Sequence, residues 1–287
     1  MINFLKYRTL YLAISLIVIL AGLFSMIRWG YVLSIDFVGG TQIDYQTQAK
    51  LDTNKVREIL RAQKIEPISV ETTANQLSLR LKAIDQATEN KMQTALQSQL
   101  KTPLTVLRSE TVGPTLGAEM MRKTGIAAVL AILGILIYMS FAFKGWTFAL
   151  AAIIALLHDV LVLVGTYSLL SHFFGAQVDT LFVTALLTTM SFSVHDTIVI
   201  FDKIREYMRS EARSNIEYFA NKALTETLVR SVNNSMTIIF MLLALILLGG
   251  STIKFFVIAL LIGTITGTYS SPFVATPVLV WLEKRKK

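Results

Sequence analysis

The chain has 287 residues, of which 53% are hydrophobic, and its formal net charge is +8. Soluble globular domains hold roughly 45–50% apolar residues, so this composition favours a membrane protein. Because the sequence has no cysteine and no GxxxxGKS/T, GxGxxG or HExxH string, it excludes disulfides and thiolate metal sites, predicts no nucleotide-binding or zinc-protease site, and leads us to expect no cofactor.

Six apolar runs are long enough to cross a membrane, since about 20 helical residues span a hydrocarbon core of ~30 Å. They cover residues 9–29, 125–143, 146–170, 180–201, 235–249 with some preceding residues, and 253–281. The first run resembles the start of a signal peptide, but no A-x-A-like cleavage site follows it. We therefore expect it to be retained as the first span.

The basic residues predict the orientation of these spans, because segments rich in Lys and Arg stay in the cytoplasm. They gather after the fourth span and at the end of the chain: Lys203, Arg205, Arg209, Arg213, Lys222, Arg230, Lys284, Arg285, Lys286 and Lys287. The loop 171–179 has no Lys or Arg. We expect both termini in the cytoplasm, with 1–29 as the N-terminus and first span, 30–123 as an extracytoplasmic domain, and 124–287 as five spans with a cytoplasmic loop at 202–234 and a basic tail.

The segment between the first two spans has the pattern of a small folded domain. Strands are predicted at 41–46, 68–72, 76–82 and 104–109, and helices at 53–63 and 85–100. The order βαββαβ is that of the ferredoxin-like arrangement. The predicted fold class is therefore an all-α membrane protein of six transmembrane helices with a small α+β ferredoxin-like extracytoplasmic domain.

Asp196 lies inside the apolar run 180–201. An Asp at the centre of a membrane helix costs roughly 2.5–3.5 kcal/mol, and such residues usually face a protein interior or a water path. Thr189 and Ser193 share its helix face and form a polar stripe with it. We interpret the stripe as a proton or ion path; the alternative is a carboxylate near the helix end that interfacial water reaches.

Arg230 precedes the fifth span. An Arg stays charged and can form a forked pair with a carboxylate, so we predict that Arg230 pairs with Asp196. A carboxylate that alternates between an Arg partner and a proton is a proton switch. The alternative is that Arg230 is only a positive anchor at the membrane surface.

The dipeptide His-Asp occurs twice in apolar runs, as His158-Asp159 and His195-Asp196. His and Asp can both bind metals, but adjacent residues point about 100° apart on a helix. We therefore predict no metal site, and we expect Asp159 to satisfy a polar partner between helices.

Small residues recur every four positions in the last span, at Gly263, Gly267 and Ser271. Such a ridge allows two helices to approach closely. Pro272 and Pro277 predict a kink in the second half of this span.

Apolar residues at helical spacing predict an amphipathic helix over 215–227. We expect this helix to lie on the inner membrane surface. The alternative is a helix in a solvated loop.

Four motifs in chain order resemble the SecD/SecF family of bacterial protein-export membrane proteins, within the RND superfamily. They are Asp36-Phe-Val-Gly-Gly40-Thr, Val112-Gly-Pro-Thr-Leu-Gly117, Val194-His-Asp-Thr-Ile-Val-Ile-Phe-Asp-Lys-Ile-Arg-Glu206, and Gly263 to Ser271. SecD-type members usually have a much larger external region than this chain. The resemblance implies a subunit in the bacterial inner membrane that uses the proton-motive force to help export preproteins.

The resemblance also implies partners and site residues. The implied partners are SecD, the SecYEG channel, YajC as a further candidate, unfolded preprotein segments, protons and the lipid bilayer, with no nucleic acid. Asp196 and Arg230 fall where the family's proton-pathway Asp and Arg lie, with His195, Ser193, Thr189 and Asp159 as accessory polar residues. Two departures are His195, where the family usually has Asn, and the run Ser231-Val-Asn-Asn-Ser235. His195 could add a second titratable group or keep a hydrogen bond.

Two other classes of function fit parts of the sequence. Half of another RND-type exporter, for lipid or drug, would share the six spans and Asp196 but predicts a far larger capturing domain. A scaffold protein would not need Asp196. An enzyme is not expected, because the sequence offers no nucleophile with a matching base.

Overall fold

The computed structural model describes residues 3–48, 50–143, 145–210 and 215–286. Of the basic residues that predict the orientation, Arg213 and Lys287 lie outside these ranges. The chain forms two compact units, one of Met1–Val32 with Ile126–Lys287 and the other of Leu33–Gly125. These boundaries are within three residues of the predicted domain at 30–123.

The prediction of six spans is confirmed among the described residues, where six helices are long and apolar enough to cross a membrane. Five are α1 (Arg8–Arg28, after the short η1, Phe4–Tyr7), α5 (Pro114–Ala142), α6 (Trp146–Phe174), α7 (Thr180–Ser210) and α8 (Ile216–Leu248). The sixth is built from α9 (Lys254–Ser270), η3 (Ser271–Ala275) and α10 (Thr276–Arg285). Short elements connect them: β1 (Val32–Leu33), β6 (Gln177–Val178) and η2 (Ser251–Ile253).

The sixth span changes its winding at η3, which is a π-helical turn. Pro272 has no N–H to donate and its ring crowds the preceding turn, so the α-helical pattern cannot continue there. The wider turn keeps the chain helical, and the Thr276 hydroxyl donates to the Ser271 carbonyl at 3.0 Å. The prolines predicted to kink this span thus lie in and just after a π turn.

The predicted surface helix at 215–227 is not a separate element but the first turns of α8. Phe219, Ala220, Ala223 and Leu224 are buried in the protein core and not on a membrane surface. The predicted loop 202–234 is likewise mostly helix, because α7 extends to Ser210. An apolar stripe has the same sequence pattern whether lipid or another helix covers it, which explains the difference.

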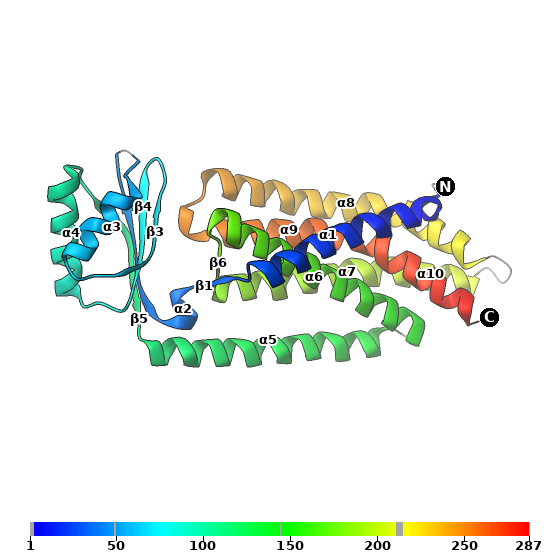
Figure 1. The fold of residues 1–287 in the computed structure, drawn as a ribbon. Helices are drawn as coiled ribbons and strands as arrows, with labels where there is room; N and C mark the ends of the chain where they lie inside the picture. Colours follow the sequence, from blue (N-terminus) through cyan, green and yellow to red (C-terminus); the bar gives the residue numbers. More distant parts are fainter. Residues whose placement is uncertain (1–2, 49, 144, 211–214, 287) are drawn as a thin grey trace. The chain divides into compact units, whose positions relative to one another are not determined.

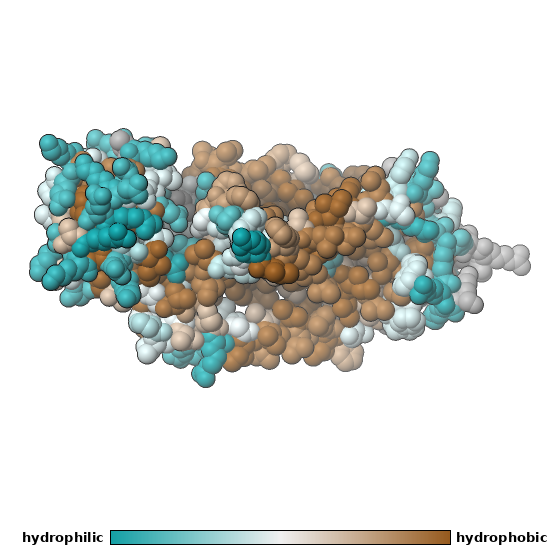
Figure 2. Space-filling view, viewed as in Figure 1, coloured by the Kyte–Doolittle hydropathy of each residue, from teal (hydrophilic) through white to brown (hydrophobic). Residues whose placement is uncertain are grey.

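The helices α1, α6, α7, α8, α9 and α10 run alongside one another in the first unit (Figure 1). Between α1 and α6 the backbones nearly touch: a Cβ on Gly22 would lie 2.8 Å from the Gly165 Cα. The Ser25 and Ser168 hydroxyls bond across the same contact at 2.8 Å. Figure 2 shows apolar residues over much of the surface of these helices, as a lipid-facing protein requires.

Both chain termini lie at the same end of the helical unit (Figure 1). Ion pairs join three segments there, since Glu217 accepts from Arg8 at 3.1 Å and from Lys284 at 2.6 Å. The start of α1, the start of α8 and the end of α10 are therefore held together.

The second unit is a four-stranded antiparallel sheet with two main helices. Its elements are α2 (Ile35–Val38), β2 (Gly40–Gln46), α3 (Thr53–Ala62), β3 (Pro67–Thr72), β4 (Gln76–Leu81), α4 (Gln86–Leu100) and β5 (Thr105–Val112). The strand order is β3-β4-β2-β5, and Ile43 faces Leu79 on one side and Ser109 on the other. This confirms the predicted ferredoxin-like arrangement.

The core of this unit lies between the sheet and the two helices, which cover one face of it (Figure 1). Alternate residues of β2 and β4 point into it, including Ile43, Tyr45, Leu77 and Leu79, all 0% exposed. The period of two places the intervening Asp44 and Arg80 on the other face. This alternation is why the strands could be read from the sequence.

Candidate functional site

The polar stripe of α7 faces the protein interior. Thr189, Ser193, Asp196 and Thr197 are all buried, in a helix that is largely apolar over its middle turns. Residues three and four apart lie on one helix face, so these side chains form one continuous strip. The strip carries the hydrogen-bonding groups through which α7 meets its neighbours.

The small-residue ridge of α9 packs directly on this strip. A Cβ on Gly267 would lie 2.9 Å from the Ser193 Cβ, and a Cβ on Gly263 would collide with the Thr189 side chain. One turn later, the Ser271 and Thr197 hydroxyls bond at 2.9 Å. Small residues are needed here because they let the α9 backbone approach close enough for hydroxyls of the two helices to meet.

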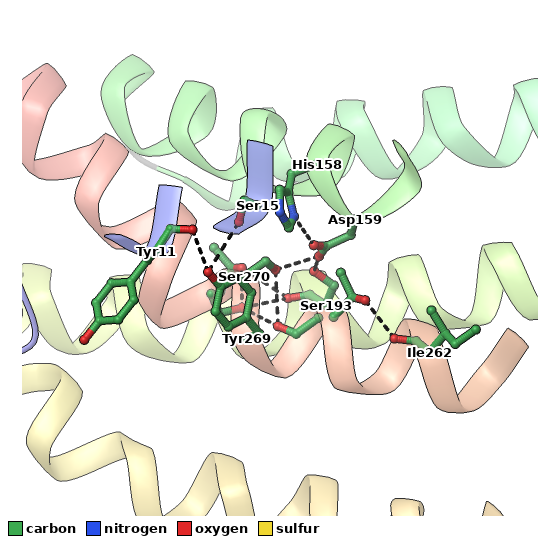
Figure 3. A network of polar contacts seen from close by, with 12 residues as sticks. Tyr11, Ser15, His158, Asp159, Ser193, Ile262, Tyr269 and Ser270 are labelled. Atoms are coloured by element: carbon green, nitrogen blue, oxygen red, sulfur yellow. Dashed lines mark hydrogen bonds and ion pairs between the residues drawn. The ribbon is translucent and has the colours of Figure 1, made fainter. Parts of the chain in front are cut away.

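Asp159 of α6 lies at the centre of a closed polar cluster (Figure 3). Its Oδ2 accepts from the hydroxyls of Ser193 on α7 and Ser270 on α9, the latter at 2.7 Å. Its Oδ1 lies 2.8 Å from Nδ1 of His158. Asp159 is 6% exposed and His158 is 7% exposed, so the cluster is enclosed by protein and joins three helices, as expected of a buried carboxylate.

A second set of hydrogen bonds lies next to this cluster and reaches α1 (Figure 3). The Tyr269 hydroxyl, one residue before Ser270, donates to the Tyr11 carbonyl at 2.8 Å. It accepts from the Ser15 hydroxyl at 3.4 Å. Four helices, α1, α6, α7 and α9, therefore meet at polar groups in the middle of the unit.

Asp196 has a different environment, at a cavity of about 240 Å³. Its Oδ2 accepts from the Ser231 hydroxyl of α8. The cavity is also lined by His195, Thr227, Arg230 and Asn234. His195 and Arg230 are exposed on the chain surface while Asp196 is buried, so the cavity leads from the surface to the carboxylate.

The predicted partner Arg230 thus shares the cavity with Asp196, but Ser231 supplies the hydrogen bond in this structure. An Arg side chain has several rotatable bonds and can reposition within such a space. The predicted ion pair between Arg230 and Asp196 is not present in this structure. The interpretation of the two residues as a proton switch remains a prediction.

The predicted site residues separate into two groups along α7. Asp196, Arg230 and His195 line the cavity, whereas Asp159, Ser193 and the α9 ridge form the closed cluster. The sequence analysis gave no site role to Ser231, Ser270 or Tyr269. Ser231 was noted only as the start of a run that departs from the family pattern, and Ser270 lies within a segment that was interpreted as a helix-packing ridge.

The cluster and the cavity offer few groups for a metal ion. Within residues 3–48, 50–143, 145–210 and 215–286, no three His, Cys, Asp or Glu side chains come together. The side chains that the two groups bring together are carboxylates, imidazoles and hydroxyls, which can form hydrogen bonds with one another.

Residues 91–285 match the family described as protein export membrane protein SecD/SecF, C-terminal. The chain is 41% identical to the protein translocase subunit SecF of Thermobaculum terrenum, with 99% of this chain and 95% of that protein covered. It is 35% identical to the protein translocase subunit SecF of Pseudomonas aeruginosa, with 98% and 91% covered.

A solved structure has the same fold. SecDF of Thermus thermophilus, a translocon-associated membrane protein, matches 99% of this chain with a TM-score of 0.88 and 30% identity. The match covers 39% of the SecDF chain, so this chain spans well under half the length of that protein.

Proposed function

The chain belongs to the SecD/SecF family of protein-export membrane proteins, as a SecF-type protein translocase subunit, and on this premise we propose that it couples proton movement at Asp196 to protein export. It is a multi-pass transport component and not an enzyme. The observation that carries the proposal is a buried carboxylate at the inner end of a cavity that also holds Arg230.

Asp196 can exist in two states that differ in charge. The ionised carboxylate is stabilised by the Ser231 hydroxyl and by Arg230 when that side chain swings toward it. Protonation removes the charge and with it the attraction for Arg230, leaving a neutral acid that tolerates burial. If two conformations of the protein differ in their affinity for this proton, the proton concentration on the side to which the cavity opens shifts the population between them.

The proposed orientation places both termini in the cytoplasm and the Leu33–Gly125 unit outside a bacterial inner membrane. Basic residues at the shared end of the helical unit, including Arg8 and Lys284, support it. Cysteines introduced at Ala83, and at Ala212 outside the described residues, test it with an impermeant thiol reagent on spheroplasts. Labelling of the cysteine at position 212 without labelling of the cysteine at position 83 would contradict the proposed orientation and indicate the opposite one.

The proposed partners are SecD and, through it, the SecYEG channel, with YajC as a further candidate and unfolded preprotein segments as clients. The match to a chain in which SecD and SecF are joined supports the first. The exposure of Arg230, which lines the cavity, supports a partner on that side. An Arg in a lipid-facing position is costly, so a protein surface is its more stable cover.

The test compares two carboxylates on α7. Asp196→Asn keeps the shape of the side chain but cannot exchange charge, whereas Asp202→Asn makes the same change at an exposed residue six positions later. We expect Asp196→Asn to insert normally, bind SecD and lose the acceleration of late-stage translocation by an imposed proton gradient in inverted vesicles. Asp202→Asn should keep that acceleration. Wild-type gradient dependence in Asp196→Asn would show that the proton path lies elsewhere.

A further inference from the structure

The His158–Asp159 pair is a titratable site that the proposed function does not use. Both side chains are more than nine-tenths buried, and Nε2 of His158 is buried with no hydrogen-bond partner among the described residues. A buried polar atom without a partner is unusual, because it gives up its bonds to water without replacement. The cluster around Asp159 is therefore incomplete at one atom, and that atom can bind a proton.

We propose that His158 and Asp159 form a second proton-binding site in the helical unit, separate from Asp196, at which the exchanged proton binds Nε2 of His158. The inference deepens the proposed function, because it adds a second proton-binding group to the same membrane unit.

The hydrogen-bond arrangement fixes where a proton can bind. One proton is shared between Nδ1 of His158 and Oδ1 of Asp159, which lie 2.8 Å apart. Oδ2 already accepts from Ser193 and Ser270 and has no place for a proton of its own. With that proton on Nδ1, Nε2 is the free ring nitrogen, and a second proton therefore binds there. In this step the N–H bond forms as an O–H bond of the hydronium ion that donates the proton breaks, which leaves water.

The charges of the surroundings give this step a driving force. With one shared proton the pair carries a net negative charge, and with two it is neutral. The described side chains that bond to Asp159 are His158, Ser193 and Ser270, and none of them is a Lys or Arg that would compensate the buried anion. Burying an uncompensated charge is costly, and uptake of a proton at Nε2 removes that cost.

Each helix packed on the pair contributes few other titratable groups. From α9, Tyr269 has its ring centroid 6.4 Å from that of His158, and from α1, Tyr11 presents its carbonyl to the Tyr269 hydroxyl. On α7, the contact residue is Ser193, and the nearest ionisable residues along that helix are His195 and Asp196. Ser193, which bonds to Asp159, therefore lies about one turn before Asp196 on α7.

The number of histidines makes the site directly observable. The chain has three, His158, His172 and His195, so ¹⁵N-imidazole NMR of the full chain with SecD in lipid nanodiscs resolves each, with His172→Gln and His195→Gln giving the assignments. We expect His158 to gain a proton on Nε2 as the pH is lowered over the range in which the protein stays folded. A His158 that keeps the same neutral form over this range in the wild-type protein would overturn the proposal without any variant.

Two variants separate this site from Asp196. Asp159→Asn removes the charge that balances a protonated imidazole, so we expect His158 to take up no proton over the same range; an unchanged titration would overturn the proposal. Asp196→Asn should leave the His158 titration in place. If His158 titrates while Asp196→Asn keeps normal gradient-driven export, the proposed function fails and this inference stands; if His158 does not titrate while Asp196→Asn loses that export, this inference alone fails.

Discussion

Asp159 and Asp196 each follow a histidine in an apolar helix, yet their surroundings differ in every respect that matters for charge. Asp159 accepts from two serine hydroxyls and meets an imidazole, all enclosed between α6, α7 and α9. Asp196 accepts from one serine and borders a cavity that leads to exposed His195 and Arg230. The same dipeptide therefore forms a closed site in one helix and an open site in the next.

The difference shows that tertiary packing, and not the local sequence, decides how a membrane carboxylate is used. The closed site is held by close contact of α9 on α7 and should respond mainly through stability. The open site has room for water or a moving Arg and should respond mainly through transport. The variants below set these two responses against each other.

The largest effect is expected from filling the α7–α9 contact with Gly267→Leu. A Cβ alone would lie 2.9 Å from that of Ser193, so a leucine must separate the two helices and disrupt the closed site. Overpacking of this kind costs about 1–3 kcal/mol or more, and we expect a lower melting temperature and weaker assembly with SecD. Gly134→Leu on α5, where nothing lies within 4 Å, is the matched control; equal stability of the two variants would contradict the close packing.

The next effect comes from removing one hydroxyl at each site. Ser193→Ala deprives the enclosed Asp159 of a donor that nothing can replace, and we expect a loss of about 1–3 kcal/mol in unfolding free energy. Ser231→Ala removes the matching donor from Asp196, but water in the cavity can replace it, so the loss should stay below about 1 kcal/mol. Chemical denaturation followed by tryptophan fluorescence measures both, and a larger loss in Ser231→Ala would break the comparison.

A smaller, graded effect is expected at the open site from two replacements of Arg230. Arg230→Lys keeps the charge but loses the forked geometry, whereas Arg230→Met loses both. We expect Arg230→Met to reduce gradient-driven translocation about tenfold, corresponding to ~1.4 kcal/mol, and Arg230→Lys to reduce it less. Similar rates for both variants would show that the charge of Arg230 is not used.

The smallest effect concerns a carboxylate outside the membrane, Glu71 of the sheet unit, which serves as a reference. Partial burial, and then the nearby Asp44 carboxylate, raise the pKa of Glu71 above its ordinary 4.5, against the opposing effect of Arg80. Ionised Glu71 therefore weakens the folded state once the pH exceeds this raised pKa, and the weakening disappears below about pH 4.5.

Glu71→Gln should accordingly raise the melting temperature of the full chain at pH 7 and lose this advantage at acid pH. The gain should be well under about 1 kcal/mol, because the burial is only partial and solvent still reaches the side chain and screens its charge. Glu66→Gln, at an exposed residue of the same unit, is the control. A gain for Glu71→Gln that persists below pH 4.5 would assign the effect to packing and not to charge.

Much of the fold could be predicted because its elements have strong periodic patterns. The six spans follow from uninterrupted apolar runs, and β2 and β4 follow from the alternation that places Ile43 and Leu79 in one core. The first turns of α8 were predicted as a surface helix, because an amphipathic stripe does not say whether lipid or protein covers it.

The candidate site could be predicted only where a single residue is conspicuous in the sequence without knowledge of its partners. Asp196 stands out as a carboxylate in an apolar run, but the partners of Asp159 lie 34 and 111 residues away along the chain. Contacts over such separations depend on how helices pack, which a single sequence does not specify. For the same reason Ser231, and not the more conspicuous Arg230, proved to be the hydrogen-bond partner of Asp196.

The π turn at Ser271–Ala275 has a consequence for the phase of the sixth span. A π turn acts as a one-residue insertion in an α-helix, and each residue of an α-helix turns the following side chains by about 100°. The extra residue therefore sets the direction in which the buried face of α10 points relative to the α9 ridge. That face includes Leu279, Val280 and Leu282. Deleting one residue of the turn would rotate α10 about its own axis and present this apolar face to the wrong side, so the length of the turn, and not only its prolines, sets the register of the last helix.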